Sequence, residues 1–245
     1  MDALILAAGY GSRLAALSPS KPLTPVCGVP LIEIGVRQAV AAGVSRVVVI
    51  TGHEADAVEA FLGGLALRLG LPIHAERLDD WSRPNGWSVL AGARRIAGNY
   101  LLLMADHMFE TALLARLLEE APSGHGVTLA IDRRCDSPLI DPDDATWVRT
   151  GPKGEIVAIG KAIAPRDAVD CGAFLATPEL AAAIAAAIAA GAAGSLSDGM
   201  QRLAERRRAM TLDIGEAWWL DVDDPRAHAL AEAEAPARIA ALGAA

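Results

Sequence analysis

The first hundred residues alternate between short apolar runs and amphipathic segments, and this alternation restricts the possible folds more than any other feature. Apolar runs at residues 3–8, 46–50 and 99–105 have the length and composition of buried strands. Between them, residues 30–43 and 58–65 place apolar side chains at helical spacing. Repeated strand–helix–strand units predict a parallel sheet that is covered by helices on both faces.

The pattern loosens after about residue 130. Residues 132–145, DRRCDSPLIDPDDA, contain few apolar side chains and are predicted to form an exposed loop. No stretch is rich enough in Pro, Gly or Ser to divide the chain, so a single domain over residues 1–245 is expected. The remaining elements predicted are strands over 146–150, 155–160, 168–176 and about 210–214, and helices over about 178–190 and 195–208.

Composition narrows the classes of protein. Hydrophobic residues make up 53% of the 245, enough for a full core, and the formal net charge of −8 argues against broad binding to nucleic acid or an anionic membrane. The apolar run at 180–193 is shorter than the ~20 residues of a membrane span, which favours a helix of a soluble protein. Cys27, Cys135 and Cys171 lack metal-type spacing, and a reducing cytoplasm is the expected location.

The stretch LILAAGYGSRL, residues 4–14, carries a buried strand directly into a glycine loop. Such loops after the first strand of an α/β sheet commonly face phosphate, because bare backbone N–H groups can approach an anion. A dinucleotide-binding loop needs a third glycine where this chain has Leu14, and a Walker loop needs Gly-Lys-Ser/Thr. What remains is Gly9, Gly11 and Arg13, with the arginine at the far end of the loop.

LAAGYGSRL followed by KPLTPVCGVPLIE at residues 21–33 resembles the opening signature of the nucleotidyltransferases that activate sugar phosphates and alcohol phosphates. The resemblance implies an α/β, three-layer Rossmann-like fold of the GT-A type with a mixed, mostly parallel central sheet. It implies that Arg13 holds the departing pyrophosphate and that Lys21 lies near the α-phosphate. The loop residues implied to contact the nucleotide are Ala7, Ala8, Gly9, Gly11 and Ser12.

Carboxylates for Mg²⁺ are expected at strand ends. Asp106 directly follows an apolar strand, where it could ligate the metal or cap a helix, and the resemblance favours the metal. AWWLDVDDP at 217–225 resembles the family's late metal-binding stretch, in which Asp221 and Asp223 would share one face of a strand. Either or both could bind Mg²⁺, whereas Asp224 before Pro225 fits a helix N-cap. Trp218 and Trp219 are interpreted as packing residues.

RPNGWSVLAG at 83–92 matches the family position that reads the base. Asn85, Gly86 and Ser88 are expected to contact the nucleotide there, together with Ala105 beside the metal carboxylate. The form N-G-x-S, combined with Ala-Asp-His at 105–107, is most similar to the cytidylyltransferases that act on alcohol phosphates. The resemblance therefore implies CTP as the co-substrate.

The acceptor side rests on IVAIGKAIAPRDAVDCGAFLATPEL, which resembles the inositol-1-phosphate branch. There, Lys161 is implied to meet the acceptor phosphate; a surface lysine near a strand end is the alternative. Asp170 and Gly172 match the branch, but Cys171 replaces a threonine, so any hydroxyl contact from that side chain is lost. Ser197 and Asp198 could bind acceptor hydroxyls or equally cap the following helix.

These patterns predict an Mg²⁺-dependent transfer from CTP to an alcohol phosphate, foremost inositol 1-phosphate, with residues 1–130 as the nucleotide half and 131–245 as the acceptor half. Phosphocholine, an aminoalkylphosphonate or a sugar 1-phosphate are alternative acceptors, and a catalytically silent nucleotide-binding subunit is the alternative from another class. Relatives are sometimes fused to a phosphotransferase that uses the CDP-alcohol, and that later step is expected to belong to a separate protein. The oligomeric state is not predicted.

Overall fold

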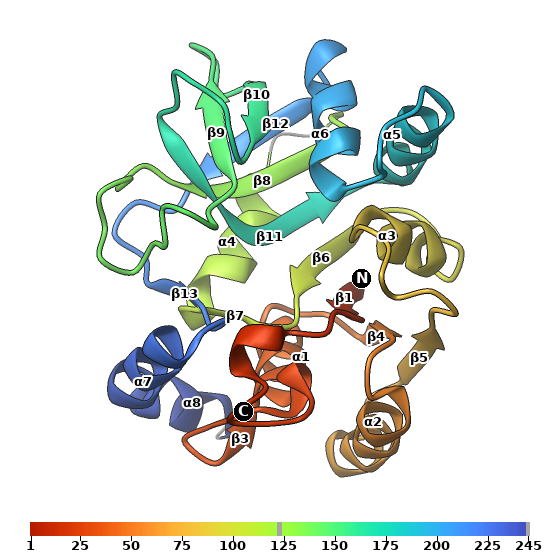
Figure 1. Ribbon diagram of the computed structural model, residues 1–245, viewed down its shortest axis with the longest axis vertical. Helices are drawn as coiled ribbons and strands as arrows, with labels where there is room; N and C mark the ends of the chain where they lie inside the picture. The colour runs from red at the N-terminus through yellow and green to blue at the C-terminus, as the bar shows by residue number, and fades with distance from the viewer. Residues whose placement is uncertain (122–123, 244–245) are drawn as a thin grey trace.

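The computed structural model describes residues 1–121 and 124–243, arranged as a central sheet between two layers of helices (Figure 1). The nine strands of the sheet are β1 (Asp2–Ala7), β4 (Arg46–Thr51), β5 (Ile73–Arg77), β6 (Tyr100–Met104), β8 (Val127–Asp132), β9 (Trp147–Thr150), β10 (Ile156–Gly160), β11 (Ala168–Ala176) and β12 (Ala209–Asp213). Their order is β10-β9-β11-β6-β1-β4-β5, with β8 paired to β11 and β12 paired to β8. The strands β6, β1, β4 and β5 are parallel, whereas β11 runs antiparallel to β6 and β8, so the sheet is mixed.

Strand β1 explains why both faces of the sheet are covered. Its side chains alternate, so Ala3 and Ile5 enter one apolar core while Leu4 and Leu6 enter the other. The first core is closed by α1 (Leu31–Ala41), α2 (Ala55–Leu69) and α4 (Thr111–Glu120). The second core is closed by α3 (Gly86–Ala93), α5 (Pro178–Ala189) and α6 (Leu196–Glu205).

A two-stranded ribbon lies beside the main sheet. It pairs β7 (His107–Phe109) with β13 (Trp219–Asp221) in antiparallel fashion and packs in a third apolar core with α7 (Pro225–Glu234) and α8 (Pro236–Gly243). In Figure 1 this ribbon joins the blue C-terminal helices to the end of β6. The other short elements are the hairpin β2 (Pro25–Val26) and β3 (Val29–Pro30), and the 3-10 turns Ser12–Leu14 and Lys21–Leu23.

Most predicted elements are present. The strand predicted over 168–176 is β11 with the same bounds, and β9 and β10 form an antiparallel pair around the GPKG turn, as predicted. The Asp224 carboxylate accepts a hydrogen bond from the Ala227 N–H at 2.7 Å, which confirms it as the N-cap of α7. The sequence patterns had predicted neither β8 nor α4. Within the described residues, no helix is both long enough and apolar enough to cross a membrane.

Candidate active site

The glycine loop leaves the carboxyl end of β1 and turns back at Gly11. Gly11 has φ +62°, in the left-handed region, and a Cβ at this position would collide with the Lys21 side chain. Glycine is therefore required both for the turn and for the close approach of Lys21. Lys21 therefore packs directly against the glycine loop and extends toward the end of the neighbouring strand β6.

Lys21 forms an ion pair with Asp106, which follows β6 in a turn. His107 Nδ1 lies 2.9 Å from Asp106 Oδ1, so two basic groups face this carboxylate. Burial favours the neutral form of Asp106, but the charge of Lys21 and the hydrogen bond to His107 outweigh it and lower the pKa. Asp106 is therefore ionised and does not cap a helix, because the residues that follow it form β7.

The ribbon brings the late carboxylates to the same place. Asp221 on β13 is paired with His107 on β7, and the Val222 N–H donates to the Asp106 carbonyl at 2.9 Å. Carboxylate oxygens of Asp106 and Asp221 and a ring nitrogen of His107 lie within 4.8 Å of one another. The predicted convergence of the two distant sequence segments therefore appears in the structure.

A second group within the same spacing consists of Asp144, Asp221 and Asp223, so Asp221 belongs to both groups. Burial and the neighbouring Asp221 raise the pKa of Asp223 to about 7, and burial together with Asp106 raises the pKa of Asp221. One oxygen of Asp221, Oδ1, is buried without a hydrogen-bond partner. Carboxylates that repel one another, with an orphaned oxygen among them, fit a hard divalent cation such as Mg²⁺.

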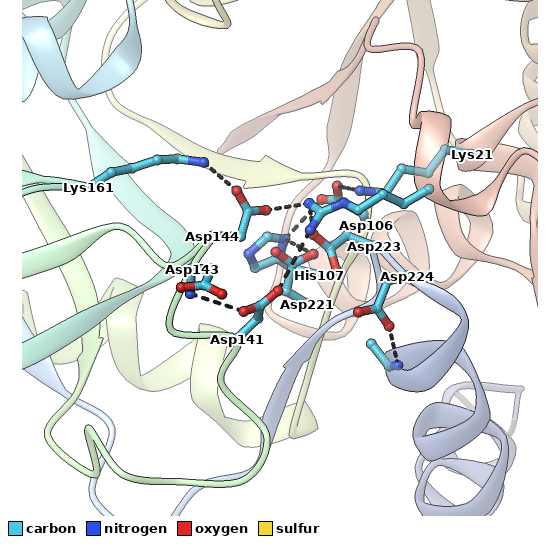
Figure 2. A network of polar contacts seen from close by, with 12 residues as sticks. Lys21, Asp106, His107, Asp141, Asp143, Asp144, Lys161, Asp221, Asp223 and Asp224 are labelled. Atoms are coloured by element: carbon cyan, nitrogen blue, oxygen red, sulfur yellow. Dashed lines mark hydrogen bonds and ion pairs between the residues drawn. The ribbon is translucent and has the colours of Figure 1, made fainter.

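The segment 132–145 differs from the prediction of an exposed loop. Ile140 is buried in the first core and anchors the loop, which turns Asp144 into the site. Asp144 forms ion pairs with both Arg13 and Lys161. Figure 2 shows the pair with Lys161. Burial opposes its charge, but these two cations outweigh it and lower the pKa of Asp144. Arg13 also forms an ion pair with Asp223.

Two cavities meet at Lys21 and Asp106. The loop cavity, about 250 Å³, is lined by the glycine loop, Ser88 and Trp81. The ribbon cavity, about 270 Å³, is lined by side chains of both halves of the chain, Arg13 and Lys161 among them. The two cavities share Lys21, Asn85, Met104 and Asp106. A molecule in one cavity would therefore meet a molecule in the other at the Lys21–Asp106 pair.

The structure gathers most of the predicted site residues around these cavities. The predicted site residues that line the loop cavity are Ala7, Ala8, Gly9, Gly11, Lys21, Asn85, Ser88, Ala105 and Asp106. The residues that line the ribbon cavity are Arg13, Lys21, Asn85, Asp106, Lys161, Asp170, Gly172, Ser197, Asp221 and Asp223. Ser12, Gly86 and Asp198 line neither of the two.

The structure distinguishes the two roles that the sequence left open for Asp198, which are contact with the acceptor and capping of a helix. Its carboxylate accepts hydrogen bonds from the Gly194 and Ser195 N–H groups at 2.9 and 2.8 Å, in a capping box at the start of α6. Asp198 is therefore a cap, whereas Ser197 faces the ribbon cavity. Gly86 also has a packing role, because a Cβ there would collide with the Gly194 carbonyl oxygen.

Asp170 and Gly172 lie at an irregularity of β11. The register of β11 against β8 shifts between Asp170 and Phe174, and Gly172 has φ +77°. A Cβ at Gly172 would collide with the His107 ring, so the glycine makes room for the imidazole. Burial raises the pKa of Asp170 to about 6, against the hydrogen bond that its carboxylate accepts from the Gly172 N–H at 2.7 Å.

Three further side chains at the site had no assigned role in the sequence. His107 belongs to the Ala-Asp-His motif without a role of its own, Asp144 lies in the segment predicted as an exposed loop, and no sequence motif includes Trp81. The acid-rich DPDD run was the one available signal for Asp144, but such runs are also typical of solvated loops. Trp218 and Trp219 are buried, as predicted; Trp219 donates to Asp132 at 2.8 Å and its ring stacks on His107.

A glycine loop after β1, a cation beneath it and carboxylates at two strand ends define a nucleotidyltransferase site. The chain belongs to the family of MobA-like NTP transferase domains, whose model matches residues 3–210. The resemblance and the class of enzyme predicted from the sequence are thereby confirmed.

The names of individual relatives are more informative about substrates than the family model is. The chain is 34% identical over 95% of its length to a "Bifunctional IPC transferase and DIPP synthase" of Rubrobacter xylanophilus, covering 51% of that protein. It is 35% identical over 60% of its length to a "CMP-5'-(3-aminopropyl)phosphonate synthase" of Streptomyces rubellomurinus, covering 24% of that protein. The chain thus spans about half the length, or less, of these curated relatives.

Solved structures share the fold. The inositol-1-phosphate CTP transferase from T. maritima superposes with a TM-score of 0.80 at 21% identity, with 96% of each chain covered. A UDP-glucose pyrophosphorylase complexed with UDP-glucose gives the same TM-score at 18% identity, covering 97% of this chain and 98% of that one. The predicted three-layer, Rossmann-like fold of the GT-A type with a mixed central sheet is confirmed.

Proposed function

We propose that this chain is an Mg²⁺-dependent cytidylyltransferase that converts CTP and an alcohol phosphate, foremost inositol 1-phosphate, into the CDP-alcohol and pyrophosphate. The observation that carries the proposal is the Lys21–Asp106 pair at the junction of the two cavities. The similarity over 95% of the chain to a bifunctional IPC transferase and DIPP synthase supports the choice of substrates.

The position of each cationic side chain indicates which phosphate group it would contact. Lys21 lies at the junction of the cavities, where it would neutralise the α-phosphate. Arg13 would hold the β- and γ-phosphates with its planar guanidinium, and Lys161 would hold the acceptor phosphate. An oxygen of the acceptor phosphate attacks the α-phosphorus; a new P–O bond forms and the bond to the β-phosphate breaks. The charge that develops on pyrophosphate is neutralised by Arg13, and no covalent enzyme intermediate is needed.

Asp106, Asp221 and Asp223 are the proposed metal ligands. Held by these carboxylates, Mg²⁺ would supply positive charge against the charge that develops on the leaving group. Asp221 is the central ligand of the three, because it belongs to both close groups of carboxylates and has an orphaned oxygen. Lys21 and His107 contact the Asp106 carboxylate and stabilise its negative charge.

Asp144 pairs with both Arg13 and Lys161, the two cations assigned here to phosphate groups. Substrates and this carboxylate therefore compete for the same partners. We infer that the loop carrying Asp144 withdraws from these cations when phosphates bind.

An aminoalkylphosphonate is the second candidate acceptor. The match to a CMP-5'-(3-aminopropyl)phosphonate synthase favours it, since a phosphonate presents the same anionic oxygens to Lys161. The acidic lining of the ribbon cavity, with Asp141 and Asp170 among its residues, would suit either polyol hydroxyls or an ammonium group. Use of the CDP-alcohol by a separate phosphotransferase remains a prediction.

The test is pyrophosphate release with Mg²⁺, in which CTP, UTP, GTP and dTTP are each combined with inositol 1-phosphate, phosphocholine, 2-aminoethylphosphonate and glucose 1-phosphate. We expect release with CTP and inositol 1-phosphate. Release with CTP and another acceptor would support the same mechanism with a different acceptor substrate. Absence of release with every pair would contradict the proposal and favour a silent nucleotide-binding subunit.

The metal assignment is tested by Asp221→Asn. We expect the Mg²⁺ concentration for half-maximal activity to rise about 100-fold, because even indirect partners of a metal typically cost 10- to 100-fold. Asp143→Asn is the matched control, since Asp143 is exposed and lines neither cavity. Equal Mg²⁺ dependence in the two variants would refute the role of Asp221.

A further inference from the structure

Three aromatic rings gather at the edge of the sheet next to the glycine loop, and the proposed mechanism uses none of them. Tyr10 follows β1, His53 follows β4 and Trp81 follows β5, and these three strands are adjacent and parallel. The ring centroids lie 4.5 Å apart for Tyr10–His53, 5.2 Å for His53–Trp81 and 6.2 Å for Tyr10–Trp81. Tyr10 and Trp81 nevertheless remain 49% and 38% exposed.

The position of Trp81 is set by close backbone packing. A Cβ at Gly52 would lie 2.5 Å from the Trp81 Cβ and 2.7 Å from the Ala8 carbonyl oxygen, so only glycine lets Trp81 lie against the end of β1. Hydrogen bonds before and after Trp81 in the sequence hold the segment that follows β5. The Leu78 N–H donates to the Thr51 carbonyl at 2.9 Å, and the Asp80 carboxylate accepts from Arg83 Nε at 2.9 Å.

Trp81 lines the loop cavity together with Gly9, Gly11 and Arg83, and Lys21 and Asp106 line the same cavity. It also lines a shallower cavity with Glu54 and Asp56. The acidic character of that second cavity disfavours phosphate, so a nucleotide would meet the ring from the loop cavity. A nucleotide with its phosphates at the glycine loop would have its base within the remaining part of that cavity.

We propose that Trp81 is a stacking platform for the base of the bound nucleotide, with Tyr10 and His53 packed against its ring. The inference rests on the proposed function only in assuming that the glycine loop holds a nucleoside triphosphate. Stacking on an aromatic ring is tolerant of base identity, because every base has a π-face. Trp81 therefore supplies affinity for the nucleotide, whereas the choice of cytosine belongs to other groups near Asn85.

The experiment compares a ligand that has a base with one that lacks it. CTP and inorganic tripolyphosphate are titrated by calorimetry into the wild-type protein, Trp81→Ala and Trp81→Phe, in Mg²⁺ and without an acceptor. We expect Trp81→Ala to weaken CTP binding about 5- to 150-fold, the range found when a stacked aromatic residue is removed. Binding of tripolyphosphate should change less than twofold, and Trp81→Phe should retain most of the affinity for CTP.

Trp87→Phe is the matched control, since Trp87 lies nearby on α3 but lines no described cavity. It should bind CTP as the wild type does. Equal loss of CTP and tripolyphosphate in Trp81→Ala would overturn the proposal, because it would indicate a displaced glycine loop. Unchanged CTP binding in Trp81→Ala would also overturn it.

Failure of the proposed function is a separate result. It would appear as absent pyrophosphate release with every acceptor while CTP still bound more tightly than tripolyphosphate, and stacking on Trp81 would then stand. A wild-type protein that bound tripolyphosphate as tightly as CTP would overturn stacking whatever its catalytic activity.

Discussion

Two glycines determine how closely charged side chains approach the reaction centre. Gly11 leaves room for Lys21, and Gly172 leaves room for the His107 ring; both have positive φ values, of +62° and +77°. Each glycine thus combines a backbone conformation that other residues rarely adopt with a contact that no side chain would permit. The geometry of the site therefore depends on the absence of a side chain at Gly11 and Gly172 as much as on the charged groups themselves.

Gly11→Ala is expected to lower kcat/KM for CTP about 100-fold, because the added methyl group displaces Lys21 and a shift of about 1 Å at a reaction centre can cost that much. Steady-state kinetics with CTP as the varied substrate measure it. Gly63→Ala on α2 is the control, since a Cβ there meets nothing within 4 Å. If Gly11→Ala kept wild-type kinetics, the close packing of Lys21 on the loop would be irrelevant to turnover.

At the scale of elements, the loop between β8 and β9 links the two substrate sides. Ile140 anchors it in the core, and Asp144 then reaches Arg13 from the glycine loop and Lys161 after β10. Figure 2 shows this carboxylate beside Lys161. The loop is thus both a wall of the ribbon cavity and an internal competitor for phosphate.

Asp144→Asn should bind pyrophosphate about fivefold more tightly than the wild type in Mg²⁺-free buffer, because breaking an exposed ion pair costs about 1 kcal/mol. Isothermal titration calorimetry measures the difference. The neighbouring, exposed Asp143→Asn should leave the affinity unchanged. Weaker binding in Asp144→Asn would show instead that this carboxylate helps to form the anion site.

The end of β8 makes a pH-dependent contribution to stability. Asp132 is buried and accepts hydrogen bonds from Arg134 Nε at 2.9 Å and from Trp219 Nε1 at 2.8 Å. Burial opposes its charge, but the hydrogen bonds from Arg134 and Trp219 outweigh it and lower the pKa. A lowered pKa means that the stabilisation is present above the unfolded-state pKa, near 3.9, and is lost as the pH falls through the folded-state value.

Asp132→Asn is therefore expected to reduce the free energy of unfolding by about 2 kcal/mol at pH 7, with a difference that shrinks below about pH 4. Urea unfolding at pH 7, 5, 4 and 3 gives both curves. A constant difference over this range would exclude ionised Asp132 as the source of the stabilisation.

The sequence predicted most of the elements whose apolar pattern is strong, although β8, VTLAID, and α4, TALLARLLEE, were not predicted despite clear patterns. The parallel strands were predictable because they are buried on both faces, as β1 is. In contrast, residues 133–146 carry only a few apolar anchors such as Ile140, so their burial depends on tertiary contacts that no local pattern encodes. The convergence of Asp106 with Asp221 was implied by the resemblance to the nucleotidyltransferases, whereas the position of Asp144 was not.

Local roles were ambiguous wherever one residue type serves two purposes. Ser and Asp at the start of a helix can cap it or face a ligand, and in this chain Asp198 caps while Ser197 faces the ribbon cavity. Trp81 gave no signal because its partners, Tyr10 and His53, follow other strands. Their proximity depends on the order of the strands in the sheet, which local sequence patterns do not determine.

At the scale of the whole molecule, one sheet runs through both halves of the chain. β6, from the first half, is paired with β1 on one side and with β11 on the other. The first core likewise contains Ile5 and Ala173 together, so neither half has a core of its own. The division into nucleotide and acceptor halves thus describes the site, and we expect the chain to fold as a single domain.

We therefore expect one cooperative unfolding transition for the full chain. Far-ultraviolet circular dichroism, which reports on both halves, should coincide with tryptophan fluorescence throughout a urea titration. Residues 1–130 expressed alone should lack a cooperative transition, since β6 would lose its partner β11. Two separate transitions in the full chain would contradict a shared core.

The ribbon of β7 and β13 has a consequence for how relatives diverge. The late carboxylates, Asp221 and Asp223, lie on or directly after β13, whereas the glycine loop follows β1. The glycine loop and these carboxylates can therefore be altered separately by substitution. A descendant that kept the former and altered the latter would still hold a nucleotide, and it would have become a sensor of that nucleotide instead of an enzyme.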